Sequence, residues 1–364
     1  MDNYSMFMPS YSIGGEVYNK IDEICSPYGT SAVIIGGKRA MEAIMPYLDK
    51  AMEGSAVRIT ACKWYGGECC YENVDTLASD DAVTSADMIF AVGGGKAVDT
   101  GKCVGERTGK PVFSFPTIAS NCSCCTSVSI MYTRDNVFLK PHFFMNPPVH
   151  AFINTELLAN SPSMYLWAGM GDTYAKHYEA EISARGEVPE HYIALGLEMS
   201  GMCVKPILRY GAKALEDNKN HIASYEFRQT VLAVCVTTGI VSIMLTHEHT
   251  PDYNSGLAHA IFYALTAIAE IEKNHLHGEV VAFGMLIMLL CDKNYDEFEK
   301  IFKFNKSTGL PTKTTDIGIE DNDLRALFPQ ITTMGDIKHF AFRVTVEMLE
   351  EALKELNKYN NRRI

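Results

Sequence analysis

The stretch Ala91-Val-Gly-Gly-Gly-Lys-Ala-Val-Asp-Thr-Gly-Lys102 joins an apolar run to a helical pattern through three consecutive glycines. Glycine lets the backbone approach a phosphate closely, and the first N–H groups of a helix can bind an anion. The stretch matches neither G-x-G-x-x-G nor the P-loop pattern. Three glycines followed by a lysine still favour a diphosphate site here over a turn that binds nothing, and Lys96 could add a positive charge to it.

Short apolar runs alternate with helical patterns on both sides of this turn. The runs predict strands at 31–36, 56–62, 87–92 and 112–115, and a helical pattern covers 38–52. Short strands that alternate with helices are typical of a parallel sheet covered on both faces. The N-terminal part of the chain is therefore expected to have an α/β fold.

After about residue 155 the strand signals nearly vanish and helical periods dominate. These periods cover 162–183, 190–215, 225–245, 256–271, 278–290 and 346–358. We therefore expect an α/β domain over residues 1–155 and an all-helical domain over residues 156–364.

The composition is that of a folded, acidic protein. The chain has 364 residues, 47% of them hydrophobic, and a net charge of −12. This length suggests two domains. The acidic excess argues against nucleic-acid binding, which depends on Lys and Arg. The longest apolar run, 280–291, is too short to span a membrane, and no signal-peptide pattern is visible. These features predict a soluble cytoplasmic protein.

The eleven cysteines show no spacing typical of a disulfide framework or a zinc finger. Most are expected to be small buried side chains in a reducing compartment. The exception is the cluster Cys122, Cys124 and Cys125, which includes the only C-x-x-C spacing. A redox or nucleophilic role for this cluster is an alternative to a role in lining the substrate site.

Three residues of the helical half are candidate metal ligands: Asp172 in GMGDTYAK, His259 in SGLAHAI and His277 in HLHGE. One carboxylate and two imidazoles leave coordination positions open for a substrate oxygen, as a catalytic zinc requires. Each residue alone also fits an ordinary structural role. His247-Glu-His249 and His275 are rival candidates, although the first lies in a polar stretch expected to be a loop.

Several segments together resemble the iron-containing (type III) alcohol dehydrogenase family, and in particular its glycerol dehydrogenase branch. They are VGGGKAVDTGK at 92–102, PTIAS at 116–120, GMGDTYAK at 169–176, GLAHAIFYAL at 256–265 and HGEVVAFG at 277–284. Two shorter matches lie at 308–311 and 9–14. The resemblance keeps its order over nearly the whole chain.

This resemblance implies a dehydroquinate synthase-like fold, in which residues 1–155 form the dinucleotide-binding domain and residues 156–364 the metal- and substrate-binding domain. The activity that it implies is that of a metal-dependent, NAD(P)-linked oxidoreductase. Its substrate would be a small alcohol, a polyol or a 2-hydroxy acid. The resemblance also implies that Asp172, His259 and His277 are the metal ligands. Some iron-dependent members carry a further His where this chain has Lys176, so zinc is the first choice and iron the second. Family members are often oligomers, which suggests a homo-oligomer here.

The resemblance also assigns residues to the nucleotide. Gly94, Gly95 and Lys96 match the diphosphate site, and the residues that match the nicotinamide side are Thr117, Ser120, Thr126, Val128 and Tyr132. Members that use NAD tend to carry Asp where this chain has Gly37. A missing carboxylate followed by Lys38 and Arg39 suits a 2′-phosphate, so the sequence favours NADP(H) over NAD(H).

A second departure concerns the substrate. Cys122 stands where glycerol dehydrogenases carry an Asp that binds the polyol. A thiol is a poorer hydrogen-bond acceptor than a carboxylate, and the loss of a negative charge would favour an anionic substrate. The pattern is closer to relatives of the hydroxycarboxylate dehydrogenase type, which reduce 2-oxo acids.

Two other classes of function remain open on the sequence. A dehydroquinate synthase-like lyase would need a Lys and Arg cluster for a phosphorylated substrate, and the segments around Asp172 and His259 supply none. A non-catalytic nucleotide-binding protein would be expected to have lost the metal ligands, but all three matched positions are intact.

Overall fold

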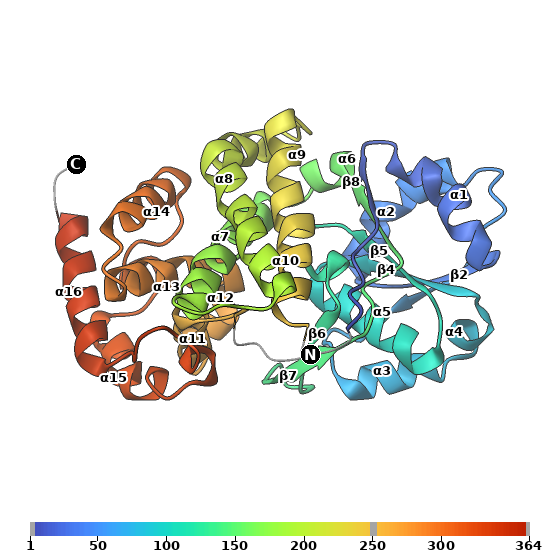
Figure 1. The fold of residues 1–364 in the computed structure, drawn as a ribbon. Helices are drawn as coiled ribbons and strands as arrows, with labels where there is room; N and C mark the ends of the chain where they lie inside the picture. Colours follow the sequence, from blue (N-terminus) through green and yellow to red (C-terminus); the bar gives the residue numbers. More distant parts are fainter. Residues whose placement is uncertain (1–3, 248–252, 362–364) are drawn as a thin grey trace. The chain divides into compact units, whose positions relative to one another are not determined.

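The computed structural model describes residues 4–247 and 253–361. The chain forms two compact units. Unit 1 comprises Met1–Ser163 and Asp217–Ile243, and unit 2 comprises Met164–Glu216 and Met244–Ile364 (Figure 1). This division differs from the single domain boundary that we expected near residue 155. The segment 217–243 returns to unit 1, where Asn218 Nδ2 donates to the carbonyl oxygens of Ala159 and Ser161 at 2.9 and 3.1 Å.

A six-stranded parallel sheet organises unit 1. In spatial order its strands are β1 (Tyr11–Gly14), β8 (His150–Asn154), β5 (Val112–Pro116), β4 (Met88–Gly93), β2 (Ser31–Gly36) and β3 (Arg58–Trp64). An antiparallel pair, β6 (Val128–Tyr132) and β7 (Phe138–Phe143), lies outside it. The predicted α/β architecture of the N-terminal half is therefore observed.

The predicted strands are found with small shifts, and others were missed. The run 56–62 predicted β3 two residues too early, because this edge strand alternates exposed and half-buried residues rather than forming a continuous apolar run. The missed strands are β1, β6, β7 and β8. Of these, β8 is fully buried but only five residues long. A run that short gives a weak periodic signal.

Helices cover both faces of the sheet (Figure 1). On one face, α1 (Ile21–Cys25) and α2 (Lys38–Ala51) pack on alternate strand residues such as Ile34 and Phe90. On the other face, α3 (Tyr71–Ala78), α4 (Asp81–Ser85) and α5 (Gly95–Thr108) pack on the intervening residues such as Val33 and Ala91. A Cβ on Gly101 would lie 2.5 Å from Ala91 Cβ. Glycine therefore lets α5 lie close against the sheet.

Unit 2 is built from helices. They are α7 (Ser163–Ala184), most of α8 (His191–Lys219), α11 (Leu257–Leu265), α12 (Ala269–Asn274), α13 (His277–Cys291), α14 (Tyr295–Thr308), α15 (Asp321–Ile331) and α16 (Val346–Asn361). Of the fifteen residues of α13, only its first is not buried, and the helix packs against α11, α14 and α16. The single helix expected over 256–271 is wrong, because a tight turn at Thr266–Ile268 divides it into α11 and α12.

Unit 1 also contains α6 (Thr155–Ala159) and most of one long apolar helical run. This run comprises α9 (Tyr225–Leu232), a π-helical turn (Ala233–Thr237) and α10 (Thr238–Leu245). By length and hydropathy alone it is the one helix of the described residues that could cross a membrane. In its most apolar stretch of 18 residues, 72% is buried inside the fold, which is typical of a core helix.

Candidate functional site

Asp172, His259 and His277 converge in unit 2 from three helices. Asp172 lies in α7 and His259 in α11, and His277 is the first residue of α13. Asp172 Oδ1 is 3.4 Å from His259 Nε2 and 3.4 Å from His277 Nε2. Across residues 4–247 and 253–361, this is the only group of three or more His, Cys, Asp or Glu residues close enough to share an ion. The structure therefore brings together the three residues proposed as metal ligands.

Two glycines allow the helices that carry these ligands to approach. A Cβ on Gly278 would lie 2.0 Å from the carbonyl oxygen of Ala168, and one on Gly171 would lie 2.2 Å from the carbonyl oxygen of Gly278. No side chain fits at such distances, so the α7 and α13 backbones meet directly. His277 and Asp172 are the immediate chain neighbours of these glycines. Their closeness follows from this backbone contact.

His259 is held from behind by a buried carboxylate. Its Nδ1 is 2.7 Å from Glu179 Oε2, and its backbone N–H donates to Glu179 Oε1 at 3.1 Å. The Glu179 side chain is fully buried, and that of His259 is 8% exposed. The ring nitrogen left facing Asp172 is Nε2. This donor set, one carboxylate oxygen and two imidazole nitrogens, suits a divalent ion such as zinc or iron.

Charges within the cluster shift its proton equilibria. Burial by itself lowers the pKa of His259, but the carboxylates of Glu179 and Asp172 outweigh it and raise that pKa to about 10. Burial by itself raises the pKa of Asp172, but hydrogen bonds from His259 and His277 hold it well below its usual range. A divalent ion would replace the shared protons. The His277 side chain is 41% exposed, so the cluster is accessible at that ligand.

The rival His275 does not join the cluster. Its Nδ1 is 2.9 Å from Glu279 Oε1, and Glu279 Oε2 accepts from the backbone N–H of Leu276 at 2.9 Å. These bonds close the N-terminus of α13 just before His277. Glu279 therefore fixes the start of the helix on which His277 stands, and His275 is part of that cap.

The other rivals also lie apart from the three ligands. Lys176, at the position where some iron-dependent relatives carry His, binds the backbone oxygen of Asn254 and its Oδ1, the latter at 2.8 Å. His247 packs edge-on against Tyr192, with ring centroids 5.0 Å apart. Glu248 and His249 lie outside the described residues.

The two glycine turns of unit 1 lie side by side. They follow β2 and β4, which are neighbours in the sheet, and Gly37 N–H donates to Val92 O at 3.3 Å. Gly93 has φ +145°, and a Cβ there would meet Ala97 Cβ at 2.8 Å, so this turn requires glycine. Gly94 is the N-cap of α5. Ligands in open α/β sheets bind at such strand ends, and the first N–H groups of α5 suit a diphosphate.

Lys96, in contrast, already has partners. Its Nζ pairs with Glu68 Oε1, donates to Asn136 Oδ1 at 2.7 Å and lies 4.7 Å from the centre of the Tyr132 ring. The positive charge that the sequence suggested for the diphosphate is thus largely neutralised. Lys38 lies over Trp64, 4.6 Å from its ring centre, at the turn that includes Gly37.

A buried ion pair anchors the segment expected to flank the nicotinamide. Lys102 Nζ is 2.8 Å from Asp99 Oδ1 and donates to Val128 O at 2.5 Å and to Thr126 Oγ1 at 3.3 Å. Ser123 Oγ donates to Asp99 Oδ1 at 2.6 Å. Thr126 and Val128 therefore help to bind Lys102, and α5 positions this segment.

The remaining candidates of this segment are close to the glycine turn or half-buried. Thr117 N–H donates to Gly93 O at 3.1 Å, so Thr117 adjoins the turn, whereas Ser120 and Tyr132 are half-buried.

The cysteine cluster of this segment is mostly buried. Cys122 is half-buried, but Cys124 and Cys125 are buried, with their sulfur atoms 3.8 Å apart. The described residues, which include every cysteine, contain no disulfide.

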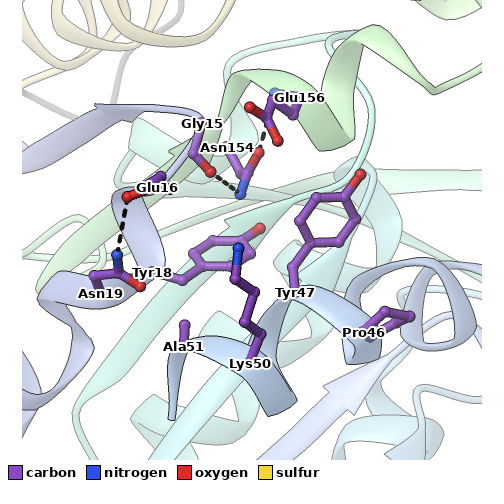
Figure 2. Close-up of a pocket in the computed structure, with 10 residues that line it drawn as sticks. All are labelled: Gly15, Glu16, Tyr18, Asn19, Pro46, Tyr47, Lys50, Ala51, Asn154 and Glu156. Carbon is purple, nitrogen blue, oxygen red and sulfur yellow. Dashed lines mark hydrogen bonds between the residues drawn. The ribbon is translucent and has the colours of Figure 1, made fainter. Parts of the chain in front are cut away.

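A pocket of about 220 Å³ lies elsewhere in unit 1, between the C-terminal half of α2 and the turn after β1 (Figure 2). Its lining residues are Gly15, Glu16, Tyr18, Asn19, Pro46, Tyr47, Lys50, Ala51, Asn154 and Glu156. Asn154 Nδ2 donates to Gly15 O at 2.8 Å, which ties that turn to the end of β8. None of the predicted site residues lines this pocket.

Comparison with known proteins gives the same family as the motifs. Residues 9–151 match the family model described as iron-containing alcohol dehydrogenase. A glycerol dehydrogenase of Thermotoga maritima is 29% identical over 99% of this chain and 98% of its own. Hydroxycarboxylate dehydrogenase A of Escherichia coli K12 is 27% identical over 90% of each chain. The resemblance to the iron-containing alcohol dehydrogenase family is confirmed.

The fold agrees. The crystal structure of glycerol dehydrogenase from Schizosaccharomyces pombe matches with a TM-score of 0.85 at 22% identity, over 99% of this chain and 91% of that one. The dehydroquinate synthase-like fold, with a parallel-sheet N-terminal part and a mainly helical C-terminal part, is therefore confirmed.

The residues that support the two candidate sites were not predicted from the sequence. Glu179 holds His259, and Glu279 caps the helix that begins at His277. The ion pair of Asp99 and Lys102 anchors the segment after β5. Asp99 and Lys102 stand within the glycine-turn motif, at the i,i+3 spacing of a helical ion pair, and could have been inferred from it. Glu179 carries no such local signal, because its partner lies 80 residues away.

Proposed function

We propose that this chain is a metal-dependent, NAD(P)-linked oxidoreductase that interconverts a small alcohol or 2-hydroxy acid and its carbonyl. The observation that carries this proposal is the convergence of Asp172, His259 and His277. Unit 2 would hold the metal, and unit 1 would hold the nucleotide at the paired glycine turns. A lyase or a non-catalytic protein is not favoured, because the ligand set is intact and the relatives described above are named dehydrogenases.

Each proposed group has a distinct task. The bound metal would polarise the substrate oxygen as a Lewis acid, and the nicotinamide would exchange a hydride with the substrate carbon. The Asp172 carboxylate and the Nε2 atoms of both histidines would hold the ion. The His277 side chain is 41% exposed and that of His259 is 8% exposed, so a substrate would approach the ion from the side of His277.

Gly94, Gly95 and the first N–H groups of α5 would bind the diphosphate, with Lys96 a weaker contributor. The nicotinamide would be lined by Thr117, Ser120, Thr126, Val128 and Tyr132. Of these, Thr126 and Val128 are held by Lys102, so the lining would be rigid before the nucleotide binds.

We propose zinc as the metal, with iron second. Asp172 Oδ1 lies 3.4 Å from the Nε2 atom of each histidine, and one carboxylate with two imidazoles is a donor set that zinc takes at catalytic sites. Lys176 is engaged with Asn254 and offers no fourth imidazole.

The proposed nucleotide is NADP(H). Gly37 supplies no carboxylate for a ribose 2′-hydroxyl, and Lys38 and Arg39 follow it. An NADP(H)-linked enzyme fits a reductive direction. Cys122 in place of a polyol-binding Asp favours a 2-oxo acid as the substrate to be reduced. From the resemblance we further propose a cytoplasmic homo-oligomer.

A substrate panel tests this function. The metal-free protein is assayed with and without zinc or iron, with NADPH or NADH, against 2-oxo acids, simple carbonyls, glycerol and diols, by absorbance of the reduced nicotinamide. We expect zinc-dependent reduction of 2-oxo acids with NADPH. Turnover of glycerol with NAD and none with oxo acids would refute the substrate and nucleotide assignments. Full activity without any metal would refute the metal centre.

A further inference from the structure

Glu179 and Asp172 project from the same side of α7. Seven residues separate them, which is nearly two turns at 3.6 residues per turn. Asp172 contacts Nε2 of His259, and Glu179 contacts Nδ1 of the same ring. One helix therefore supplies both a candidate metal ligand and a carboxylate that holds another ligand from its opposite edge.

We propose that Glu179 is a positioning residue of the metal centre, which keeps the proton of His259 on Nδ1 and so presents Nε2 to the ion. This inference rests on the proposed function, since it needs the metal. A ligand histidine commonly donates its second ring N–H to a carboxylate, which fixes the tautomer and the ring orientation. The contacts of Glu179 with His259 have that form, at 2.7 Å.

Among the described ion pairs, the Glu179 carboxylate contacts only His259. Its side chain is fully buried, and among the ion pairs of the described residues its partner is His259 rather than a Lys or Arg. Lys176, three residues earlier on the same helix, is directed to Asn254 instead. Burying a carboxylate is unfavourable unless a partner compensates its charge. Among the described ion pairs that partner is His259, so Glu179 and this ring depend on each other.

A purely structural role is the competing explanation. Glu179 Oε1 accepts the backbone N–H of His259, which is the third residue of α11 and has no partner within that helix. Glu179→Gln separates the two roles. The amide oxygen can still cap α11, but its NH₂ group then faces Nδ1. Nδ1 must become an acceptor, which moves the ring proton to Nε2 and blocks the ligand atom.

The experiment titrates Co²⁺ into metal-free wild-type, Glu179→Gln and control Glu297→Gln proteins, and follows the visible absorption of bound cobalt. Zinc affinity is measured in parallel by competition with a chromophoric chelator. Glu297 is the control because its carboxylate also accepts from a side chain of unit 2, Tyr178 Oη at 2.6 Å, but does not belong to the group that could hold the ion. We expect Glu179→Gln to lower affinity about 10- to 100-fold and to alter the cobalt spectrum. Glu297→Gln should bind as the wild type does.

The outcomes separate the two proposals. A wild-type protein that binds neither ion overturns the metal centre itself. Wild-type binding with equal affinity and an equal spectrum in Glu179→Gln overturns the role of Glu179 alone. If that variant does not fold, long-range ¹H–¹⁵N spectra of the zinc-loaded wild type decide the question. A proton on Nδ1 of His259 supports the inference, and a proton on Nε2 overturns it.

Discussion

The glycine turn of unit 1 and the ligand cluster of unit 2 are built in opposite ways. The turn is contiguous in sequence and acts through its backbone, so Gly93–Gly95 and the first residues of α5 suffice to define it. The three candidate ligands lie 87 and 18 residues apart along the chain and would act through their side chains, and the contact of Gly171 with Gly278 brings two of them together. A local motif can therefore predict the backbone turn itself, whereas the side-chain cluster depends on tertiary contacts.

The strongest test of this contrast removes a ligand. Asp172→Asn keeps the size of the side chain but loses the charge that faces both histidines at 3.4 Å. We expect loss of metal retention and a fall in turnover of roughly 10³-fold or more, because Lewis-acid stabilisation contributes several kcal/mol. Metal analysis and steady-state kinetics measure both effects.

The same variant should leave the glycine turn intact. Nucleotide affinity, followed by fluorescence, is expected to stay within about threefold of wild type because Asp172 lies in the other unit. His259→Ala is the companion variant. Full metal occupancy in both variants would remove these residues from the ligand set.

A second test adds a carboxylate side chain to the first glycine turn, at Gly37. A Cβ on Gly37 would meet only Ala40 Cβ at 3.6 Å and Tyr65 Cε1 at 3.8 Å, and its φ of −73° suits any residue. Gly37→Asp should therefore fold normally. We expect NADPH affinity to fall roughly 10- to 100-fold through repulsion of the 2′-phosphate, while NADH binding improves.

The control for Gly37→Asp is stability. Asp at the N-cap of α2 should change the unfolding free energy by no more than about 0.5 kcal/mol, which denaturant unfolding measures. Unchanged preference for NADPH in a stable variant would show that this turn does not bind the ribose.

Much of the fold was predictable for the same physical reason that the turn was. β2, β4 and β5 are buried apolar runs closed by glycine or proline, so these runs located the strands within one residue. The return of 217–243 to unit 1 was not predictable, because it depends on contacts such as Asn218 with Ala159. In the site, residue types pointed to Asp172, His259 and His277, but not to Glu179, whose burial and partner are tertiary facts.

A third test concerns the one side chain of unit 1 proposed to read the substrate. Cys122→Asp restores the carboxylate that glycerol dehydrogenases carry at the matching position. We expect kcat/KM for 2-oxo acids to fall about tenfold through charge repulsion, and that for glycerol or diols to rise by several fold through a new charged hydrogen bond. The substrate panel measures both, with Cys62→Asp as the control because Cys62 is exposed on edge strand β3. Parallel losses for both substrate classes would mean that position 122 supports structure and does not select the substrate.

The smallest expected effects test whether the turn binds the diphosphate through any side chain. Lys96 is 37% exposed and pairs with Glu68, so its charge is already balanced before a nucleotide arrives. If backbone N–H groups hold the diphosphate, Lys96→Met should lower nucleotide affinity by no more than about threefold. Glu68→Gln should raise affinity by up to about fivefold, because a partly exposed ion pair contributes at most about 1 kcal/mol and its release frees the lysine. Calorimetric titration with NADPH at two salt concentrations separates the cases, since a freed charge makes binding more salt-dependent. A loss of 100-fold in Lys96→Met would instead make this turn a side-chain site, and the contrast with the metal cluster would disappear.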